Sequence, residues 1–437
     1  MRLPEPVLTP HVTEPHAHTL AKYLERGGYR AVRTALALAP DEITEQVKQS
    51  GLRGRGGAGF PTGMKWTFVP KDSPKPKYLC VNADESEPGT FKDHVLMERN
   101  PHLLFEGCVI TCRAIGAKVA YIYVRGEFQH LIRVLEAELA SARAQGYVGK
   151  NILGSGQDCD IWVHRGAGAY EAGEESALLE SLEGKRAQPR LRPPFPAVVG
   201  LYGCPTIINN VETICNVPVI LDRGPAWFAS VGPEKNTGPK LYCVSGHVAR
   251  PGVFETSMDV TVRELIYDYA GGIPGGRALK AVIPGGSSVN VLPPSAIDAQ
   301  ASFDGLVKAG SMLGSAAMMV MDDTTDMVWV AENLIHFYRH ESCGKCTPCR
   351  EGSDWMLKIL RKIRRGEGAM RDIDLLLSVA NNIGGKTLCP FGDAEIAPVV
   401  STIQHFRHEF EHYVREGRSL VPRAAWRGES AVTAAAH

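Results

Sequence analysis

The sequence predicts an α/β domain with a mainly parallel sheet, then a small α+β module and a C-terminal helical bundle. Three observations support this prediction. Between residues 77 and 182, short apolar strands alternate with longer helical segments, as they do when helices connect parallel strands. Residues 240–283 have the order hairpin, helix, strand. From about residue 326 onward the apolar periodicity is helical.

The first domain is expected to cover residues 19–238. Before it, residues 1–18 are rich in Pro and His and lack periodicity, so we expect an N-terminal arm there. Three short helices are predicted first, at 19–26, 29–38 and 41–50. The α/β series follows, with strands at 77–82, 118–124 and 160–164 and helices at 101–115, 127–145 and 174–182.

The second part of the chain is expected to form two smaller units. A module resembling a β-grasp (ubiquitin-like) fold is predicted at 239–325, with strands at 240–245, 252–256 and 279–283 and a helix at 261–269. A bundle is predicted at 326–417, with helices at 327–337, 352–364, 373–382 and 395–415. The Ala- and Ser-rich tail at 418–437 is expected to be mobile.

Composition excludes several classes of protein. The 437 residues include 48 Lys and Arg and 48 Asp and Glu, so charge gives no sign of binding to nucleic acid or to an anionic membrane. No apolar run reaches the roughly 18 residues of a spanning helix, and the first residues lack the apolar core of a signal peptide. Eleven scattered cysteines do not resemble a disulfide framework, which favours a reducing cytoplasm. If the protein works at a membrane, other subunits hold it there.

Four cysteines late in the chain have the spacing of ligands to a 4Fe-4S cluster. Cys343, Cys346 and Cys349 follow one another at two-residue spacings, and Cys389 precedes a proline. A tight turn can direct three thiolates to three adjacent irons while a distant segment supplies the fourth. The alternative is a structural zinc site, which usually draws its ligands from two separated Cys-x-x-Cys pairs.

The segment after Cys349 is predicted to be an amphipathic helix whose N-terminus lies beside this cluster. There the positive end of the helix dipole would face the negative charge of the cluster. The predicted apolar face of that helix contains Trp355, Met356, Ile359, Leu360 and Ile363.

A glycine-rich stretch at 51–66 is predicted to bind phosphate. Six glycines fall within thirteen residues, so backbone N–H groups can approach an anion closely, and Arg53, Arg55 and Lys65 can neutralise it. Glycines 54, 56 and 59 match Gly-x-Gly-x-x-Gly, but the stretch follows a helix rather than a strand, which argues against an ordinary Rossmann motif. The alternative is a flexible linker.

Two further loops follow predicted strands, where ligands of α/β sheets bind. Residues 82–89 contain three carboxylates in four residues, which can accept hydrogen bonds from ribose, amides or a flavin ring, although a solvated acidic loop has the same composition. Residues 165–176 combine a glycine turn, an aromatic residue suited to stacking on a planar ring, and acidic residues at a helix start. A plain capped helix is the alternative there. Segments 192–195 and 209–213 add an aromatic corner and paired amides.

Taken together and in this order, these stretches resemble the flavoprotein subunit of respiratory complex I, NADH-quinone oxidoreductase. This family is called NuoF in bacteria and has a mitochondrial counterpart. Its signatures include Gly-Leu-Arg-Gly-Arg-Gly-Gly-Ala-Gly-Phe, Asn-Ala-Asp-Glu-Ser-Glu-Pro-Gly, Asn-Asn-Val-Glu-Thr and Glu-Ser-Cys-Gly-Lys-Cys-Thr-Pro-Cys-Arg. The resemblance covers about residues 20 to 415. It implies bound FMN, an NADH site over the flavin and one 4Fe-4S cluster, in a Rossmann-like flavin domain, a ubiquitin-like module and a C-terminal four-helix bundle carrying the cluster.

The resemblance also implies roles for individual residues of this chain. FMN would be held by Gly54, Arg55, Gly56, Gly57, Lys65, Asn82, Asp84, Gly173, Glu174, Asn209, Asn210 and Thr213. NADH would contact Phe60, Phe68, Glu87, Tyr170 and Phe195, with Glu85 and Glu175 as the candidate catalytic residues near the nicotinamide. The cluster ligands would be Cys343, Cys346, Cys349 and Cys389. One departure concerns Glu171 and Ala172, where the family usually has an aliphatic residue and Cys; Glu171 would either add charge near the flavin or point to solvent.

The implied reaction is hydride transfer from NADH to FMN, followed by the transfer of single electrons to the cluster and onward toward quinone. No side chain is required as a proton donor in the hydride step. The implied partners are the 2Fe-2S subunit and the large iron-sulfur subunit of complex I. Nucleic acid is not expected as a partner. In a bacterium, the chain would then be peripheral on the cytoplasmic face of the inner membrane.

Two alternatives to this interpretation stay open. The chain could be the diaphorase subunit of an NAD-linked hydrogenase or formate dehydrogenase, although it lacks the extra cysteine motif that such subunits often carry. It could instead be a non-catalytic nucleotide-binding scaffold with a structural zinc.

Overall fold

The computed structural model describes residues 1–422, and the chain divides into two compact units. The first unit comprises residues 1–86, 90–242 and 253–260, and the second comprises 87–89, 243–252 and the chain from 261 onward. The predicted β-grasp module and helical bundle therefore fall mainly in one unit, and the boundaries at 238/239 and 325/326 stay predictions. Most of the predicted mobile tail, residues 423–437, lies outside the described residues.

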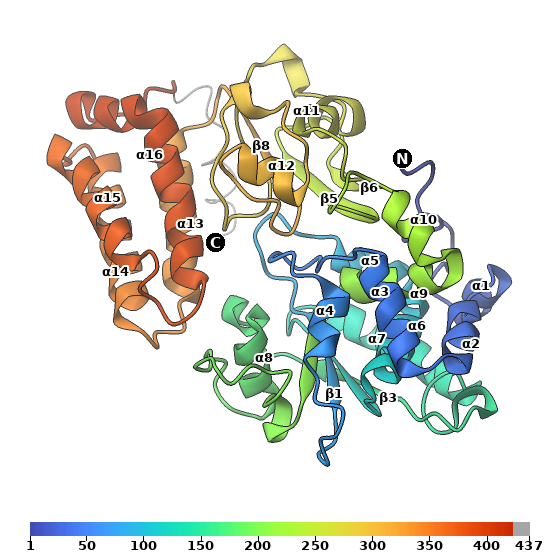
Figure 1. Ribbon diagram of the computed structural model, residues 1–437. Coiled ribbons are helices and arrows are strands. Elements are labelled where there is room, and N and C mark those ends of the chain that lie inside the picture. Colours follow the sequence, from blue (N-terminus) through green and yellow to red (C-terminus); the bar gives the residue numbers. More distant parts are fainter. Residues whose placement is uncertain (423–437) are drawn as a thin grey trace. The chain divides into compact units, whose positions relative to one another are not determined.

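The first unit is built on a four-stranded parallel sheet with the order β3-β2-β1-β4. Strands β1 and β3 are labelled in Figure 1. The strands are β1 (Tyr78–Ala83), β2 (Val119–Val124), β3 (Asp160–Arg165) and β4 (Thr206–Asn210). Strands β1 and β4 lie side by side, and Asn82 is in register with Asn210. The predicted parallel α/β domain is confirmed, although the pattern did not reveal β4, whose last two residues are polar.

Helices surround this sheet. They are α1 (Leu20–Glu25), α2 (Arg30–Ala37), α3 (Pro40–Gln49), α4 (Thr62–Thr67), α5 (Asp93–Arg99), α6 (Pro101–Ile115), α7 (Gln129–Ala144), α8 (Glu175–Leu182), α9 (Val211–Arg223) and α10 (Pro225–Ser230). Helix α6 is almost entirely buried, because the sheet and other helices cover it. Its packing against α9 is close: a Cβ atom at Gly107 would lie 2.3 Å from the carbonyl oxygen of Ile214.

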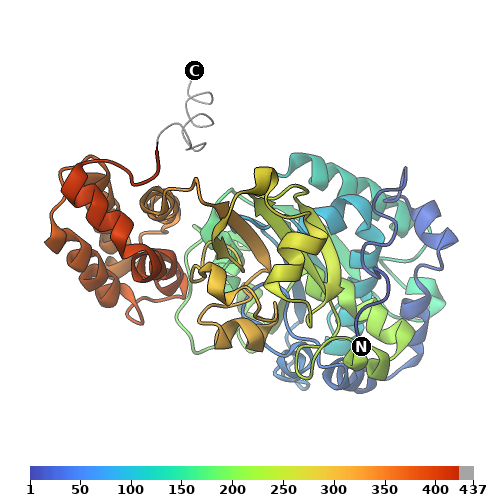
Figure 2. The same ribbon diagram turned by 90° about the horizontal axis from the view of Figure 1, so that it is seen from above.

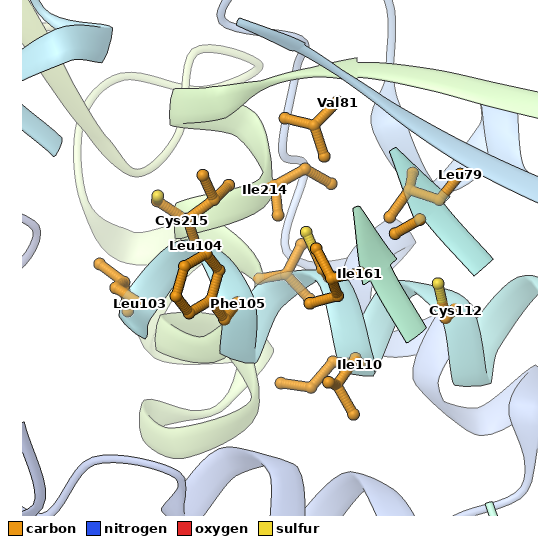
Figure 3. Packing of buried hydrophobic residues seen from close by; sticks show 14 of the residues in the cluster. Leu79, Val81, Leu103, Leu104, Phe105, Ile110, Cys112, Ile161, Ile214 and Cys215 are labelled. Atoms are coloured by element: carbon orange, nitrogen blue, oxygen red, sulfur yellow. The ribbon is translucent and has the colours of Figure 1, made fainter. Parts of the chain in front are cut away.

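The core of the first unit lies between the sheet and these helices. Figure 3 shows Leu79 and Val81 of β1, Phe105 and Ile110 of α6 and Ile214 of α9 among its members. All five side chains are fully buried. At roughly 1.5–3 kcal/mol for each large apolar side chain removed from water, this packing stabilises the attachment of the helices to the sheet.

The N-terminal residues, predicted to be an arm, are tied to the first unit. The Glu255 carboxylate accepts hydrogen bonds from the backbone N–H groups of Val7 (2.8 Å), Leu8 (2.9 Å) and Thr9 (2.8 Å). Leu8 is fully buried. The backbone hydrogen bonds to Glu255 and the burial of Leu8 therefore anchor this segment, although its sequence follows no regular period.

The second sheet has the order β6-β5-β8-β7. Its strands are β5 (Pro239–Gly246), β6 (Gly252–Ser257), β7 (Leu279–Ile283) and β8 (Ala317–Asp322). Strand β8 pairs in parallel with β5 and antiparallel with β7. Helix α11 (Val262–Glu264), which continues as a π-helical turn at Leu265–Tyr269, follows β6, and α12 (Phe303–Lys308) precedes β8. This arrangement contains the predicted hairpin, helix and returning strand.

Among the described residues of the second unit, four further helices pack on one another, as the orange and red ribbons of Figure 2 show. They are α13 (Met327–Glu341), α14 (Thr347–Arg364), α15 (Met370–Ile383) and α16 (Phe391–Glu416). The predicted helical bundle is confirmed. The predicted apolar face of α14 was wrong in one residue. Met356, Leu360 and Ile363 are buried, whereas Trp355 is 55% exposed. In the part of the chain that the structure describes, no helix is long and apolar enough to cross a membrane.

Candidate functional site

The glycine-rich stretch forms a closed loop followed by helix α4. Gly54 N donates to Phe60 O (2.8 Å), and Thr62 N donates to Leu52 O (2.8 Å), so the two ends of the loop pair with each other. At Gly57, which has φ +140°, a Cβ atom would meet no atom within 4 Å. The tip of the loop is therefore open, as a backbone cradle for an anion requires.

The loop lies against the end of strand β4. A Cβ atom at Gly56 would lie 3.0 Å from the Cβ of Asn210, so only glycine allows this approach without displacement. Arg55 N donates to Thr213 Oγ1 (2.8 Å), and Trp66 Nε1 donates to Asn209 Oδ1 (2.9 Å). The structure thus brings together the glycine loop and the paired amides, which are more than 140 residues apart in sequence.

The predicted role of the Arg55 side chain needs a correction. Its guanidinium is fully buried, and Nη2 donates to the carbonyl oxygens of Thr237 (2.7 Å) and Pro239 (3.0 Å). Burial lowers the pKa of Arg55 to about 10, and the carboxylate of Glu212 partly opposes this effect. Arg55 therefore anchors the loop, because both its guanidinium and its backbone N–H are bonded within the protein instead of being directed to the predicted phosphate.

The carboxyl end of β1 is joined to the 165–176 loop. Asn82 Nδ2 donates to Gly173 O (2.8 Å), and Asn82 Oδ1 accepts from Asp84 N (3.1 Å). Asp84 Oδ2 accepts from Ser86 Oγ (3.0 Å) and would lie 3.4 Å from a Cβ atom at Gly173. Three of the predicted flavin residues, Asn82, Asp84 and Gly173, are therefore neighbours at the sheet edge where ligands of parallel sheets bind.

Glu85 does not have the environment predicted for it. Its carboxylate accepts from the backbone N–H groups of Asp93 (2.7 Å) and His94 (3.0 Å), and it also contacts His94 Nδ1 (3.1 Å). Burial raises the pKa of Glu85, but His94 and Lys92 more than offset that effect and set it below its ordinary value. Both oxygens are used at the start of α5, so Glu85 orders this segment instead of offering a free carboxylate to the nicotinamide.

Glu175, by contrast, faces two cations at the surface of the site. Oε2 accepts from Lys65 Nζ (2.9 Å) and Oε1 from Arg192 Nη1 (2.9 Å). Burial raises the pKa of Glu175, and the two cations outweigh it, so the carboxylate stays ionised well below neutral pH. Lys65 also donates to Ile208 O (2.8 Å). Segment 192–195 was expected only to supply an aromatic corner, and no local pattern marks Arg192 as a partner of Glu175.

Neighbouring Glu174 has a structural task. As the N-cap of α8, its Oε2 accepts from the backbone N–H groups of Ser176 and Ala177, each at 2.9 Å. The adjoining Glu171 and Ala172 are buried, at 4% and 1% exposure. The alternative in which Glu171 points to solvent is therefore wrong.

Three aromatic side chains of the predicted NADH set are unusually exposed. Phe60, Phe68 and Phe195 are 45%, 50% and 58% exposed. The ring centroids of Phe60 and Phe68 are 6.1 Å apart, with an angle of 50° between the ring planes. Tyr170 is partly buried in the 3-10 turn η2 (Tyr170–Gly173). Exposed rings of this kind offer stacking surface to a planar ligand.

Glu87 belongs to the second unit, where it contacts the loop after β7. Its Oε1 accepts from Ser287 Oγ (3.1 Å) and from Ser288 N (2.9 Å). A Cβ atom at Gly286 would lie 2.6 Å from Glu87 Cγ. Its role in binding NADH stays a prediction.

The four predicted cluster ligands lie at the ends of the bundle helices. Cys343 and Cys346 are in the loop between α13 and α14, Cys349 is in the first turn of α14, and Cys389 precedes α16. Cys349 is buried and the other three are partly buried. Burial raises the pKa of the Cys349 thiol, and the charge of Glu395 raises it further.

The donor set fits a 4Fe-4S cluster. The four thiols belong to one unit, three at the α13–α14 junction and one just before α16, and Gly344, with φ +73°, forms the turn between the first two. Among the described residues, no three His, Cys, Asp or Glu side chains are grouped as ligands of a single metal ion. In a 4Fe-4S cluster each cysteine binds a different iron. The four cysteines therefore surround a larger volume than the ligands of a single metal ion do.

Three family descriptions match successive parts of the chain. Residues 47–219 match the Nuo51 FMN-binding domain, residues 240–330 the SLBB domain, and residues 329–413 the NADH-ubiquinone oxidoreductase-F iron-sulfur binding region. The last range contains all four cysteines. These matches agree with the predicted order of flavin domain, small α+β module and iron-sulfur bundle.

Whole-chain comparisons extend these matches. The chain is 56% identical to the second F subunit of NADH-quinone oxidoreductase from Rhizobium meliloti, over 95% of this chain and 99% of that protein. It is 52% identical to the F subunit of NADH-quinone oxidoreductase from Streptomyces coelicolor, over 94% and 92%. Among solved structures, an NAD+-reducing [NiFe]-hydrogenase in its air-oxidised state matches with a TM-score of 0.80 and 37% identity, covering 94% of this chain and 67% of that one.

Proposed function

This chain belongs to the F-subunit family of NADH-quinone oxidoreductase, and we propose that it oxidises NADH at the carboxyl edge of its parallel sheet. The observation that supports this location best is the contact of the glycine loop with the end of β4, which is paired with β1. Gly56 lies against Asn210 of β4, in register with Asn82 of β1. When bound, FMN accepts the hydride of NADH, and the 4Fe-4S cluster accepts electrons singly for transfer toward quinone.

At the flavin end, the chain supplies backbone and amide groups more than side-chain charge. Gly56 and Gly57 would present N–H groups to the phosphate, while the N–H of Gly54 closes the loop on Phe60 O. The ends of β1 and β4 would supply amides and the carboxylate of Asp84. Arg55 would hold the loop through its buried guanidinium. These residues orient the cofactor and exclude water, and none of them needs to move a proton.

At the nucleotide end, aromatic surface would bind the adenine and Glu175 would face the nicotinamide. Phe60, Phe68 and Phe195 present exposed rings. Lys65 and Arg192 hold the Glu175 carboxylate in a fixed orientation with its charge retained. This arrangement positions the substrate and requires no proton donor for hydride transfer.

In the second unit, Cys343, Cys346, Cys349 and Cys389 would ligate the cluster. The first turn of α14 contains Cys349, so the N-terminal end of that helix would lie beside the negatively charged cluster.

As an F subunit of NADH-quinone oxidoreductase, the chain works within a larger complex. We infer that its partners there are a 2Fe-2S subunit and a large iron-sulfur subunit. The proton-translocating complex would hold it on the cytoplasmic face of a bacterial inner membrane.

The alternative within the same chemistry is the diaphorase subunit of an NAD-linked hydrogenase. It is supported by the structural likeness to NAD+-reducing hydrogenases at 36–37% identity, which is lower than the 52–56% identity to F subunits of NADH-quinone oxidoreductases.

The test is purification of the native complex through a tag on this chain, with analysis of FMN, iron, acid-labile sulfide and nickel. We expect FMN, iron and sulfide, and NADH oxidation coupled to quinone reduction. Co-purified nickel with H2-dependent NAD+ reduction would establish the alternative. Zinc without flavin or sulfide would refute both enzymatic functions.

A further inference from the structure

A cluster of fully buried charged side chains lies directly beneath the glycine loop. It consists of Arg55, Lys92, Asp93, Glu212 and Lys240, each at most 3% exposed. The predicted cofactor set includes only Arg55 among them. Burying charges is costly unless they are paired, so a group of this size next to a binding loop requires an explanation.

The pairs in this cluster are short. Lys92 Nζ lies 2.8 Å from Asp93 Oδ1 and 2.8 Å from Glu212 Oε2. Lys240 Nζ lies 2.7 Å from the same Glu212 oxygen. The three cations face the two carboxylates of this group, and the buried carboxylate of Glu85 also acts on Lys92, so the buried charges are matched.

The cluster reaches the proposed flavin site through Asn210. Asn210 Nδ2 donates to Asp93 Oδ2 (2.6 Å), and its Oδ1 accepts from Lys92 Nζ (3.4 Å) and from Glu212 N (3.0 Å). The amide is thus bound on both sides, and its orientation is determined by buried charges rather than by solvent. The Cβ of the same residue lies against Gly56.

The start of α5 connects this cluster to Glu85. The backbone N–H of Asp93 donates to Glu85 Oε1 (2.7 Å) while the Asp93 side chain binds Asn210. One short segment therefore orders residues after β1 and residues at the end of β4.

We propose that Lys92 and Asp93 are positioning residues of the flavin site, which fix the Asn210 side-chain amide, and with it the glycine loop, in the geometry that binds FMN. This inference rests on the proposed function and assigns a role to two residues outside the resemblance-based set. They act through Asn210 and do not contact the reacting atoms. Glu212 and Lys240 complete the charge pairing that keeps Lys92 in place.

The test measures FMN affinity of the apo full-length chain by quenching of flavin fluorescence, together with the melting temperature. The variant D93N removes the charge but keeps the shape. The matched control is E106Q, because Glu106 is also buried and accepts from two backbone N–H groups, Tyr29 N and Val32 N, each at 3.0 Å. None of these contacts involves a proposed flavin residue.

We expect D93N to weaken FMN binding about 10- to 100-fold, the range for loss of a hydrogen bond to a charged group. E106Q should lower the melting temperature and leave FMN affinity within about twofold of wild type. Equal FMN affinity in D93N and wild type would overturn the proposal. If D93N does not fold, K92Q replaces it with the same expected weakening, because Lys92 contacts both Asp93 and Asn210.

A double-mutant cycle tests whether Asp93 acts through Asn210. The variant N210S keeps an oxygen that can cap α9 but lacks the amide Nδ2 that donates to Asp93. If the two residues act as one unit, D93N/N210S should bind FMN no more weakly than the weaker-binding single variant. Effects that multiply would overturn the proposal. Absence of FMN binding in wild type would instead refute the proposed function, so the two failures are distinguishable.

Discussion

The exposed ring of Phe68 provides a direct test of the nucleotide-binding surface. The side chain is 50% exposed and packs obliquely on Phe60, which is 45% exposed. A phenylalanine side chain offers roughly 200 Å², so about 100 Å² remains for a ligand to cover. At about 25 cal/mol per Å², covering that area contributes at most about 2.5 kcal/mol. Stacking of a base on an aromatic ring typically contributes about 1–3 kcal/mol.

The variant Phe68→Ala should therefore bind NADH about 5- to 100-fold more weakly, since about 1.4 kcal/mol corresponds to a factor of ten. The assay compares NADH with reduced nicotinamide mononucleotide, which lacks the adenine. Because the proposed contact is with adenine, kcat/KM for the mononucleotide should change less than about twofold. Trp162→Ala is the matched control, since Trp162 is 52% exposed in the same unit. This variant should leave kcat/KM unchanged for both substrates. An equal loss with both substrates would refute adenine stacking at Phe68.

Three further predictions concern the cluster, pH and the N-terminal segment. Cys389→Ser should remove most cluster iron and sulfide and leave FMN content unchanged; loss of both cofactors together would contradict separate sites. Because buried ion pairs lower the pKa of Glu212 to about 2 against an ordinary value of 4.5, its contribution to stability is complete above pH 4.5 and is lost as pH falls toward 2. The free energy of unfolding of Glu212→Gln should thus fall less steeply than that of wild type between pH 4.5 and 2. The same slope in both proteins would refute this role of Glu212. Glu255→Ala should cost about 1–3 kcal/mol and speed amide exchange at residues 7–9; unchanged exchange there would contradict the anchoring role.

Local signals in the sequence predicted much of the fold. Helix α6 has the predicted bounds, because Pro101 is favourable in a first turn and Gly116, at φ +72°, ends the helix in the left-handed region. The cysteine spacing likewise predicted the cluster region without reference to the fold. Helix α9 was missed because Pro218 interrupts its pattern and its polar start is typical of a loop.

The side-chain roles at the site were harder to predict. Arg55 and Glu85 belong to motifs that the resemblance to the family predicts to bind nucleotides. Both side chains are nevertheless buried and bonded within the protein. Burial and direction depend on packing of segments distant in sequence, which no local pattern reports. Lys92 and Asp93 have no motif of their own for the same reason, and only the fold brings them to Asn210.

We expect NADH to reduce a flavin and then a cysteine-ligated cluster in this chain. An anaerobic titration of the cofactor-replete protein with NADH, followed by visible absorption and EPR, tests it most directly. We predict bleaching of the flavin, accompanied or followed on further reduction by a 4Fe-4S signal that the Cys389→Ser variant lacks. Neither flavin absorption nor a cluster signal, or a cluster signal unchanged in that variant, would contradict the account.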